Sequence, residues 1–583
     1  MMRRSRLIFG MLAIAGGLLN TAIGQFDSPP HIIVFMADDL GWNDVGFHGS
    51  TQIPTPNIDA LAYNGIILNK HYALPSCTPT RAAFLSGKYP IRMGMQGAGI
   101  LGGEPRGIPL NVRILPEYLQ GLGYDTKLIG KWHVGYHTPR HTPTRRGFDY
   151  FLGFYNSYIG YYDYRYLQGN MSGFDMHANE SPAYGTEGQY ATDLFTATAL
   201  EVISRHDVLR PLYLQVSHLA PHAPLDTPYY GIDNDEFLHI GESNRRAYAK
   251  MVARLDESLG RIVSSLGDKG MLRNSVIVFM SDNGAAPIGK FRNFGSNWPL
   301  RGTKYTLFEG GVRSVAAIWS PRLISTARVS DQLFHVTDWL PTLYSVAGGD
   351  LRDLGQIDGV NQWDVLSIGT GHVRDRLLLN IDEVTRTEAA IYQRFKFVRG
   401  SLFRGYYDNA EGETGRGRNA PIYNTTRILK SAVSDAIREH LGVPVTQESG
   451  MWHLQSQATV LCRPNMTNPH YTNRYYASCN ESECLFDLSV DPCETNNIAK
   501  SYPRWVAELD LLIKQYNTVK IPQLRLPVDY RADPKYWNYT WQPWLDLYDS
   551  YYSSYNAGAA IGTVAVCAHV ALFLVIVGLR VFI

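Results

Sequence analysis

Two short apolar runs, far apart in the chain, share one pattern. Residues 32–36 read Ile-Ile-Val-Phe-Met, and residues 276–280 read Val-Ile-Val-Phe-Met. Continuous apolar runs of this length, rich in β-branched residues, predict strands that are buried on both faces, as in a parallel sheet. Oxygen-bearing side chains follow each run: Asp38 and Asp39, then Asp282 and Asn283. Because functional groups collect beyond the carboxyl ends of the strands in an open α/β sheet, we expect these four side chains to meet.

Helical spacing alternates with the predicted strands. Apolar residues recur at helical intervals between residues 248 and 266, and in a shorter segment between 115 and 122. Further strands are expected at 126–129 and 212–216. This alternation predicts an α/β fold in which helices flank a large, mostly parallel or mixed sheet.

The composition changes after about residue 399, where Gly, Asn, Tyr and Cys become more frequent and the apolar runs become short. A chain of 583 residues is also too long for one ordinary domain. We therefore predict a large domain at residues 25–399 and a smaller C-terminal α+β domain at residues 400–545.

The N-terminus has the pattern of an export signal. Arg3, Arg4 and Arg6 precede an apolar run at residues 7–19, and a small-residue cleavage pattern ends at Gly24. The run is short for a membrane span, so we predict a signal peptide at residues 1–24 and entry into the secretory pathway, with the lysosome or the cell surface as destination. Asn-x-Ser/Thr sequons agree with export, and five of them predict glycosylation: Asn170, Asn424, Asn465, Asn480 and Asn538. Asn179-Glu180-Ser181 also fits the pattern, but Pro182 follows it.

The C-terminal residues 561–583 are almost wholly apolar, apart from His569 and Arg580. Their length suits a transmembrane helix. The small residues before them suit a GPI-anchor signal equally well. Both interpretations stay open, and both predict membrane attachment through the tail.

The charge of the chain is balanced, with 54 Lys and Arg against 53 Asp and Glu. No long basic run occurs, so we expect no nucleic-acid partner. An anionic substrate would have to be bound by a local group of cations rather than by the whole surface.

Several motifs in this chain resemble the successive blocks of the sulfatase family, in the same order and with similar spacing. They are Asp38-Asp39-Leu40-Gly41-Trp42, Cys77-Thr78-Pro79-Thr80-Arg81, Gly130-Lys131-Trp132-His133, Pro221-His222-Ala223-Pro224, and residues 297–304. The similarity extends from about residue 31 to about residue 526 and is greatest to the arylsulfatase B group (N-acetylgalactosamine-4-sulfatase and arylsulfatases I and J). Thr80 stands where that group usually has serine, and it keeps the hydroxyl.

The resemblance implies an alkaline-phosphatase-like fold and a set of site residues. A formylglycine-generating enzyme would oxidise Cys77 to formylglycine, the nucleophile, and Arg81 would hold it. Asp38, Asp39, Asp282, Asn283 and residue 77 would bind one Ca²⁺ ion. Lys131 and Lys304 would bind sulfate oxygens, His133 would contact the formylglycine hydroxyl, and His222 would lie near the leaving oxygen. Such oxygen ligands suit Ca²⁺ or Mg²⁺ better than zinc.

The predicted function is therefore calcium-dependent hydrolysis of sulfate esters. The predicted substrate is 4-sulfated N-acetylgalactosamine in glycosaminoglycans, or an aryl sulfate. A phosphate-ester hydrolase of the same superfamily is an alternative, although it would be expected to use a Ser or Thr nucleophile and two zinc ions. A catalytically silent surface binding protein is the other alternative.

Two further features leave alternatives open. Cys462, Cys479, Cys484 and Cys493 allow three disulfide pairings. We prefer Cys484 with Cys493, which bracket a short strand and a turn, and hence Cys462 with Cys479. A tyrosine-rich stretch at residues 158–166 is expected mainly to pack or to form a surface loop, with a sugar-lining role as the alternative.

Overall fold

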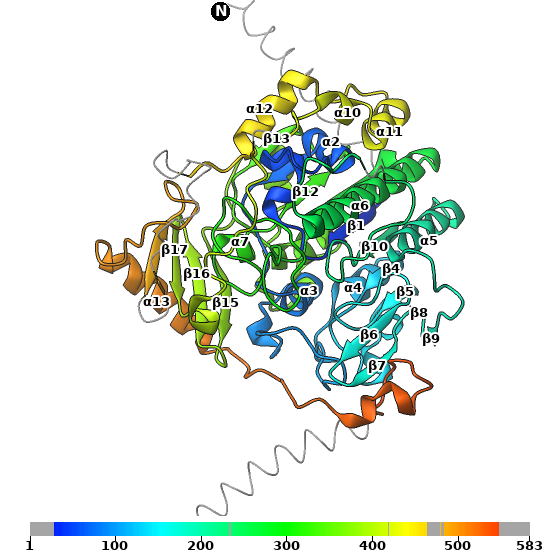
Figure 1. The fold of residues 1–583 in the computed structure, drawn as a ribbon, viewed down its shortest axis with the longest axis horizontal. Helices are drawn as coiled ribbons and strands as arrows, with labels where there is room; N and C mark the ends of the chain where they lie inside the picture. Colours follow the sequence, from blue (N-terminus) through cyan, green and yellow to red (C-terminus); the bar gives the residue numbers. More distant parts are fainter. Residues whose placement is uncertain (1–27, 233–234, 418, 463–477, 480–482, 547–583) are drawn as a thin grey trace, which may run out of the picture.

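The strands β1 (His31–Ala37) and β11 (Ser275–Ser281), which carry the two echoing runs, are parallel neighbours in a ten-stranded sheet. The computed structural model describes residues 28–232, 235–417, 419–462, 478–479 and 483–546 (Figure 1). The register places Ile32 opposite Val276 and Met36 opposite Met280. All the side chains of both strands are buried, which explains why the strands read as continuous apolar runs.

The large sheet is mixed, as predicted. Its strand order is β13-β2-β12-β11-β1-β10-β4-β5-β8-β9. The strands from β11 to β5 are parallel to one another, whereas β12 is antiparallel to β11. The other strands of this sheet are β2 (Ile66–Leu68), β4 (Asp125–Lys131), β5 (Tyr150–Phe154), β8 (His177–Ala178), β9 (Ser181–Pro182), β10 (Leu212–Ser217), β12 (Ala316–Trp319) and β13 (Arg328–Ser330).

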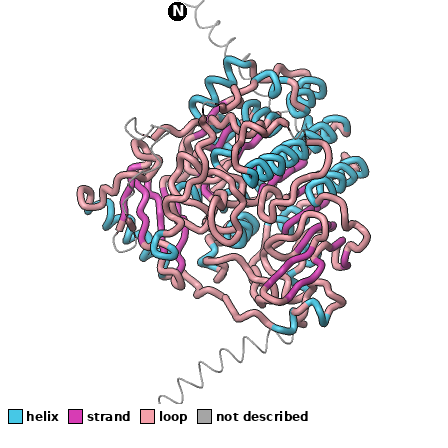
Figure 2. Tube along the Cα trace, viewed as in Figure 1, coloured by secondary structure: helices cyan, strands magenta, loops and turns pink. Residues whose placement is uncertain are grey.

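Two groups of helices flank this sheet, and Figure 2 shows them in cyan around the magenta strands. One group contains α2 (Pro56–Asn64), α5 (Ala191–Arg205) and α6 (Ser243–Asp268), with α5 and α6 side by side. The other contains α3 (Cys77–Ser86), α4 (Leu115–Gly121) and α8 (Trp339–Val346), which contact one another. The predicted helix at 248–266 corresponds to α6, whose first turn is capped by the Glu242 side chain accepting from Arg245 N over 2.6 Å. The α/β fold is therefore confirmed.

A second, antiparallel sheet forms a small separate body at the left of Figure 1. Its strands are β15 (Arg376–Asp382), β16 (Thr387–Tyr392), β17 (Phe395–Arg399) and β18 (Cys484–Asp487), and α13 (Pro503–Asn517) packs on it. Between β17 and β18 the chain returns to the large body, where α11 (Ala432–Leu441) contacts α2 and α6. The chain therefore passes between the two bodies more than once. The division into domains at residue 400 stays a prediction.

The segment that follows α13 runs back along the large body, in orange in Figure 1. Backbone hydrogen bonds join Leu524 N to Gly94 O over 3.1 Å and Asp529 N to Gly103 O over 2.7 Å. Farther on, Trp541 N donates to Phe174 O over 2.9 Å, beside the hairpin of β6 (Arg165–Gln168) and β7 (Met171–Phe174). The described chain thus ends, at residue 546, against the large body.

The preferred disulfide pairing is wrong. The disulfides are Cys462–Cys493 and Cys479–Cys484, with Cα–Cα distances of 5.9 and 5.6 Å. Cys484 begins β18, and this extended strand carries the chain away before it turns toward Cys493. Cys493 instead packs with Cys462 against Trp42 and Leu300 of the large body, a contact that sequence spacing does not reveal.

Several predictions concern residues outside the described part of the chain. The signal peptide, the apolar tail with Cys567, and the sequons at Asn465 and Asn480 all lie there. Asn170, Asn424 and Asn538 lie in the described part of the chain and are exposed, as glycosylation requires. Their glycosylation stays a prediction. Among the described residues, none of the helices combines the length and apolar character that crossing a membrane requires.

Candidate active site

Acidic and amide side chains meet where β1 and β11 end. Because these strands are parallel and in register, Asp38 and Asp39 leave the same sheet edge as Asp282 and Asn283. Asp39 N donates to Asp282 Oδ1 over 3.2 Å, and Asn283 Nδ2 donates to Asp39 Oδ1 over 2.6 Å. None of the four side chains has exposed surface. The structure thus brings together the four oxygen-bearing side chains that the sequence places at the two strand ends.

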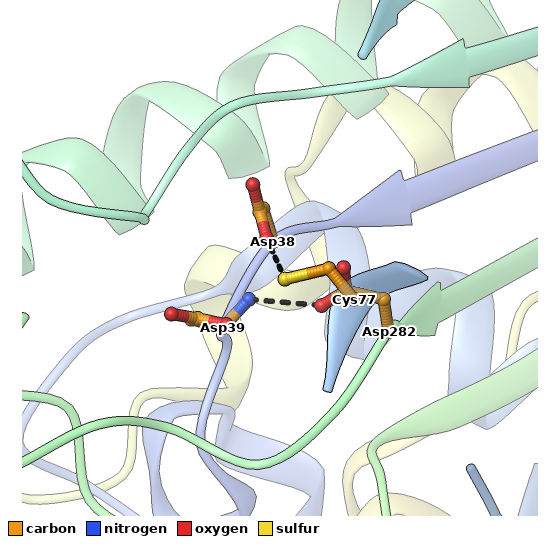
Figure 3. Close-up of side chains that lie close together, drawn as sticks. All are labelled: Asp38, Asp39, Cys77 and Asp282. Carbon is orange, nitrogen blue, oxygen red and sulfur yellow. Dashed lines mark hydrogen bonds between the residues drawn. The ribbon is translucent and has the colours of Figure 1, made fainter. Parts of the chain in front are cut away.

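Cys77 completes this cluster as the first residue of α3 (Figure 3). Its Sγ donates to Asp38 Oδ1 over 3.6 Å, and the residue is 3 % exposed. Ligand atoms of Asp38, Asp39, Cys77 and Asp282 all lie within 4.8 Å of one another. Burial is the main reason that the pKa of the Cys77 thiol is raised to about 12, with Asp282 and Asp38 adding to it against Lys131 and Lys304. An unmodified thiol at this position would therefore stay protonated and be a poor nucleophile.

Three cationic side chains balance the three buried carboxylates. Arg81, one turn into α3, donates from Nη2 to Asp282 Oδ2 over 2.9 Å. Lys131, at the end of β4, donates from Nζ to Asp38 Oδ2 over 2.6 Å. Lys304 Nζ lies 2.7 Å from Asp39 Oδ1. Pairing of this kind is what allows six charged groups to be buried at one place.

The local sequence explains how β4 delivers Lys131. Gly130 has a φ of +99°, and a Cβ added there would collide with the Ser217 carbonyl oxygen of β10. Only glycine therefore allows the two strands to approach so closely at this point. The strand then ends in Lys131, and His133 follows with a φ of +53°.

Electrostatic coupling favours the charged forms of Asp38 and Lys304. Burial alone would raise the pKa of Asp38, but Lys131, His222 and Arg81 together outweigh it and keep that pKa below the usual value. Burial likewise opposes the charge of Lys304, yet Asp39 holds the pKa of Lys304 well above its usual value. Opposite charges in the cluster thus compensate the cost of burying Asp38 and Lys304.

Some polar atoms of the cluster lack partners. Among the described residues, Asn283 Oδ1, Arg81 Nη1 and His133 Nδ1 are buried and accept or donate no hydrogen bond. Such atoms are uncommon inside proteins, and a bound water, ligand or ion is one way in which they are satisfied. An amide oxygen without a donor, beside three carboxylates, fits an oxygen-ligated divalent cation.

His222 and His218, which both follow β10, have different surroundings. His222 Nε2 lies 3.6 Å from Asp39 Oδ2, and its Nδ1 contacts the Ala223 carbonyl oxygen. Burial lowers the pKa of His222, while Asp38 and Asp39 oppose that shift. His218 instead contacts Ser258 Oγ over 3.0 Å and packs against Phe35. Only His222 of this pair therefore borders the acidic cluster.

His133 lies beside Thr78, the residue after Cys77, whose Oγ1 donates to the His133 carbonyl oxygen over 2.9 Å. Its Nε2 is 3.0 Å from the Ile100 carbonyl oxygen. Burial, followed by the charge of Lys131, lowers the pKa of His133 well below its usual value, so the ring is neutral. The free Nδ1 of a neutral ring that donates from Nε2 is a hydrogen-bond acceptor.

The sequence analysis missed one further buried carboxylate, that of Asp44, which supports the site. Asp44 accepts hydrogen bonds from Tyr248 Oη over 2.6 Å and from Ser296 N over 2.8 Å, and it pairs with Arg245. Tyr248 was predicted only as part of the apolar face of a helix. Asp44 anchors the segment that contains Asn293, whose Nδ2 donates to the Asp39 backbone over 2.8 Å. An Asp five residues after Asp39 was the available sequence signal.

Comparison with known proteins gives a consistent set of relatives. A family model described as "Sulfatase" matches residues 30–349. Arylsulfatase J of Mus musculus is 36 % identical over 521 residues, which cover 89 % of this chain and 80 % of that protein. N-acetylgalactosamine-6-sulfatase of Rattus norvegicus is 35 % identical over 395 residues, which cover 64 % and 71 % of the two chains. A crystal structure of Ps i-CgsB in complex with k-i-k-neocarrahexaose is 26 % identical, with a TM-score of 0.57 over 74 % of this chain and 98 % of that one.

Proposed function

This chain belongs to the sulfatase family, whose members hydrolyse sulfate esters, and we propose that it does so through a formylglycine formed from Cys77 beside one bound Ca²⁺ ion. The observation that carries this proposal is the state of Cys77. It lies buried among three carboxylates and three cations, with its pKa raised to about 12. A protonated thiol there is a poor nucleophile. A formylglycine at the same place would have the carboxylates and cations of the cluster as polar neighbours.

The proposed ligands of the cation are Asp38, Asp39, Asp282 and Asn283, together with residue 77. The unpartnered Asn283 Oδ1 supports this set. When bound, Ca²⁺ would counter the negative charge on the sulfate and on the nucleophile. With Asp38 and Asp39 engaged by the cation, the ammonium groups of Lys131 and Lys304 are available to sulfate oxygens.

The reaction needs two hydroxyl groups on the nucleophilic side chain, which is why a cysteine would have to be converted. A hydrated formylglycine carries two hydroxyls on one carbon, one to attack sulfur and one whose ionisation releases sulfate as the aldehyde returns. Arg81 would orient these hydroxyls, since its Nη1 has no partner among the described residues. His133, a neutral acceptor at Nδ1, would hold one hydroxyl hydrogen.

His222 would donate the proton that the leaving alcohol needs. Its Nδ1 contacts a carbonyl oxygen, so Nδ1 carries a hydrogen in every protonation state. Nε2, on the side of Asp39, therefore holds a proton only when the ring is charged. Proton donation from His222 to the leaving oxygen is thus general-acid catalysis by an imidazolium.

The proposed substrate is sulfated N-acetylgalactosamine in glycosaminoglycans, with the sulfate at position 4. The resemblance to the arylsulfatase B group supports this sugar and this position. The N-acetylgalactosamine-6-sulfatase relatives support the same sugar with sulfate at another position, and the neocarrahexaose complex of the structural relative supports an oligosaccharide ligand. Rates on 4-sulfated and 6-sulfated disaccharides, compared side by side, decide the position.

The central experiment is peptide mass spectrometry on residue 77 of the secreted protein, paired with hydrolysis of an aryl sulfate. We expect formylglycine at this position, activity that a chelator removes, and none in Cys77→Ala. An unmodified thiol in a protein without activity would refute the enzyme proposal and favour a silent binding protein. Faster hydrolysis of a phosphate monoester than of any sulfate ester would favour the phosphatase alternative.

The proposed location is the secretory pathway, with membrane attachment through the tail. Release from cells by a GPI-cleaving phospholipase would identify a GPI anchor. Retention after that treatment, with release only by detergent, would identify a transmembrane helix.

A further inference from the structure

Three aromatic rings meet at the side of the cluster that carries His222. They belong to Tyr158, in the loop after β5, to His222, in the loop after β10, and to Phe291, in the loop after β11. Their ring centroids are 6.0 Å apart for Tyr158 and His222, 5.9 Å for His222 and Phe291, and 5.6 Å for Tyr158 and Phe291. The three loops leave the carboxyl ends of strands in one sheet, which is where ligands of such sheets bind.

Exposure distinguishes the three rings. His222 is 2 % exposed, whereas Tyr158 and Phe291 are only half-buried. The two outer rings, those of Tyr158 and Phe291, are therefore the ones of the three that a ligand in solution can reach. Within the tyrosine-rich stretch, Tyr161, Tyr164 and Tyr166 are buried in the apolar core. Tyr162 is half-buried like Tyr158, but its ring stacks on that of Tyr229, at a centroid distance of 4.4 Å, instead of on His222.

Neighbouring groups fix the outer rings in place. Tyr158 Oη donates to the Leu167 carbonyl oxygen over 3.2 Å, and its ring meets that of Tyr166 edge-on at 5.0 Å. Lys290 Nζ lies 5.2 Å from the centroid of Phe291. Rings that are already ordered lose little conformational entropy when a ligand binds.

We infer that Tyr158 and Phe291 form a subsite for the sugar ring that carries the sulfate, and that they determine specificity rather than take part in bond breaking. This inference rests on the proposed function, which places His222 beside the leaving oxygen. A pyranose has an apolar C–H face as well as polar edges, and aromatic side chains supply apolar surface of matching width. A sugar ring bound against Tyr158 and Phe291 would lie next to His222. The ester oxygen on that ring would then be close to the residue that is proposed to protonate it.

The test separates sugar recognition from sulfate recognition. Two inhibition constants are measured for the secreted enzyme, one for inorganic sulfate and one for the desulfated disaccharide product. In Tyr158→Leu and in Phe291→Leu, we expect the KM for the sulfated disaccharide and the inhibition constant of the desulfated product to rise about three- to tenfold. The inhibition constant of inorganic sulfate is expected to stay the same.

Two further variants control for folding and for the hydroxyl group. Tyr158→Phe keeps the ring and is expected to keep near-normal constants. Tyr230→Leu replaces a tyrosine that is 84 % exposed and is expected to behave like the unchanged chain. Melting temperatures of all variants identify any that fails to fold.

The outcomes distinguish the inference from the proposed function. Unchanged constants for the sugar-containing ligands in both leucine variants, or equal rises for the product and for inorganic sulfate, would overturn the subsite. A loss in Tyr158→Phe as large as in Tyr158→Leu would overturn the role of the ring. Failure of the unchanged chain to hydrolyse any sulfate ester would instead refute the proposed function, and calorimetric titration with the desulfated disaccharide would then still report on the sugar site.

Discussion

Lys131 donates from Nζ to Asp38 Oδ2 over 2.6 Å, and neither side chain reaches the surface. Each residue is the partner that makes burial of the other tolerable. A bound cation would take over the same role for Asp38. The pair thus connects the stability of the chain to the occupancy of the metal site.

Lys131→Met is expected to show this connection directly. In a chelator the variant should lose about 3–5 kcal/mol of unfolding free energy, because the Asp38 carboxylate is left buried without a partner. Added Ca²⁺ should restore more stability to the variant than to the unchanged chain, while kcat/KM stays at least about a hundredfold lower. Denaturant unfolding with and without Ca²⁺ measures the first effect. Lys127→Met, on the same strand with a half-exposed partner, Asp125, is the matched control.

Removal of the metal is expected to abolish hydrolysis reversibly. Ca²⁺, and to a lesser degree Mg²⁺, should restore activity to chelated enzyme, whereas Zn²⁺ should not, because the ligand atoms are oxygens. Asn283→Ala should raise the Ca²⁺ concentration for half-maximal activity and for half-maximal thermal stabilisation by about tenfold or more. Asn69→Ala, at a buried asparagine bonded to Asp331, should leave both values unchanged. Equal Ca²⁺ dependence in the two variants would contradict the assignment of Asn283.

Cys77→Ser is expected to act once and stop. Serine can attack sulfur through its single hydroxyl, but it lacks the second hydroxyl that releases sulfate. Intact-mass measurement after incubation with substrate should show the added mass of one sulfuryl group per chain, with no continuing turnover. Cys77→Ala should acquire no such mass. Steady turnover by the serine variant would show that the second hydroxyl is not needed.

The contribution of Glu494 to the stability of the chain is expected to fall as pH rises from about 5 to about 8. Burial, opposed by Lys396 and reinforced by Glu309, raises the pKa of Glu494 to about 7. The folded chain therefore holds a proton that the unfolded chain has already released, so this contribution is complete below about 4.3 and is lost as pH rises through 7. Glu494→Gln should remove about 1–3 kcal/mol of the pH dependence in that interval.

Chemical unfolding at several pH values tests this assignment. The groups that face Glu494 are Lys396, at 2.8 Å, and Glu309, which is paired in turn with Arg313. Glu508→Gln, at an exposed glutamate on α13, serves as the control and should keep the slope of the unchanged chain. A Glu494→Gln variant with that same slope would assign the pH dependence to other buried carboxyls, such as Asp59 and Asp256, whose pKa values burial also raises to about 7.

The two disulfides are expected to contribute unequally. Cys462 and Cys493 are 31 residues apart, and Cys479 and Cys484 are five apart. Loop-closure entropy predicts a stabilisation of about 3.7 kcal/mol for the longer loop and about 2 kcal/mol for the shorter. The double variant Cys462→Ala with Cys493→Ala should therefore melt at a lower temperature than Cys479→Ala with Cys484→Ala. It should also lose more activity, since the longer disulfide packs on Trp42 and Leu300 near the metal ligands.

The acidic cluster could be predicted from the sequence because the pattern that indicates it lies within two short segments. β1 and β11 are buried on both faces, so they read as apolar runs, and their last residues could be placed at one edge of a parallel sheet. The meeting of Asp38, Asp39, Asp282 and Asn283 followed from that placement. The choice of His222 came instead from the resemblance of Pro221-His222-Ala223-Pro224 to a block of the family.

The remainder depended on contacts between distant segments. Cys493 pairs with Cys462 because both pack on Trp42, and spacing along the chain contains nothing about that contact. The ring of Tyr158 meets Phe291 and His222, which come from other loops, and the spacing of the tyrosines does not indicate those contacts. Asp44 is bonded to Tyr248 and Arg245 of α6, about 200 residues away in the chain, and no local pattern indicates those partners.

Because Cys77 is buried in the folded chain, its conversion has to take place before folding is complete. At 3 % exposure in the folded chain, the residue is out of reach of any modifying enzyme. Its neighbours Asp282 and Lys304 are synthesised long after it, so the nascent chain leaves residue 77 accessible until β11 joins β1. The proposed oxidation must occur in that interval. A variant that folds faster, or a cell that supplies the oxidising enzyme too late, would therefore accumulate well-folded protein that can never be activated.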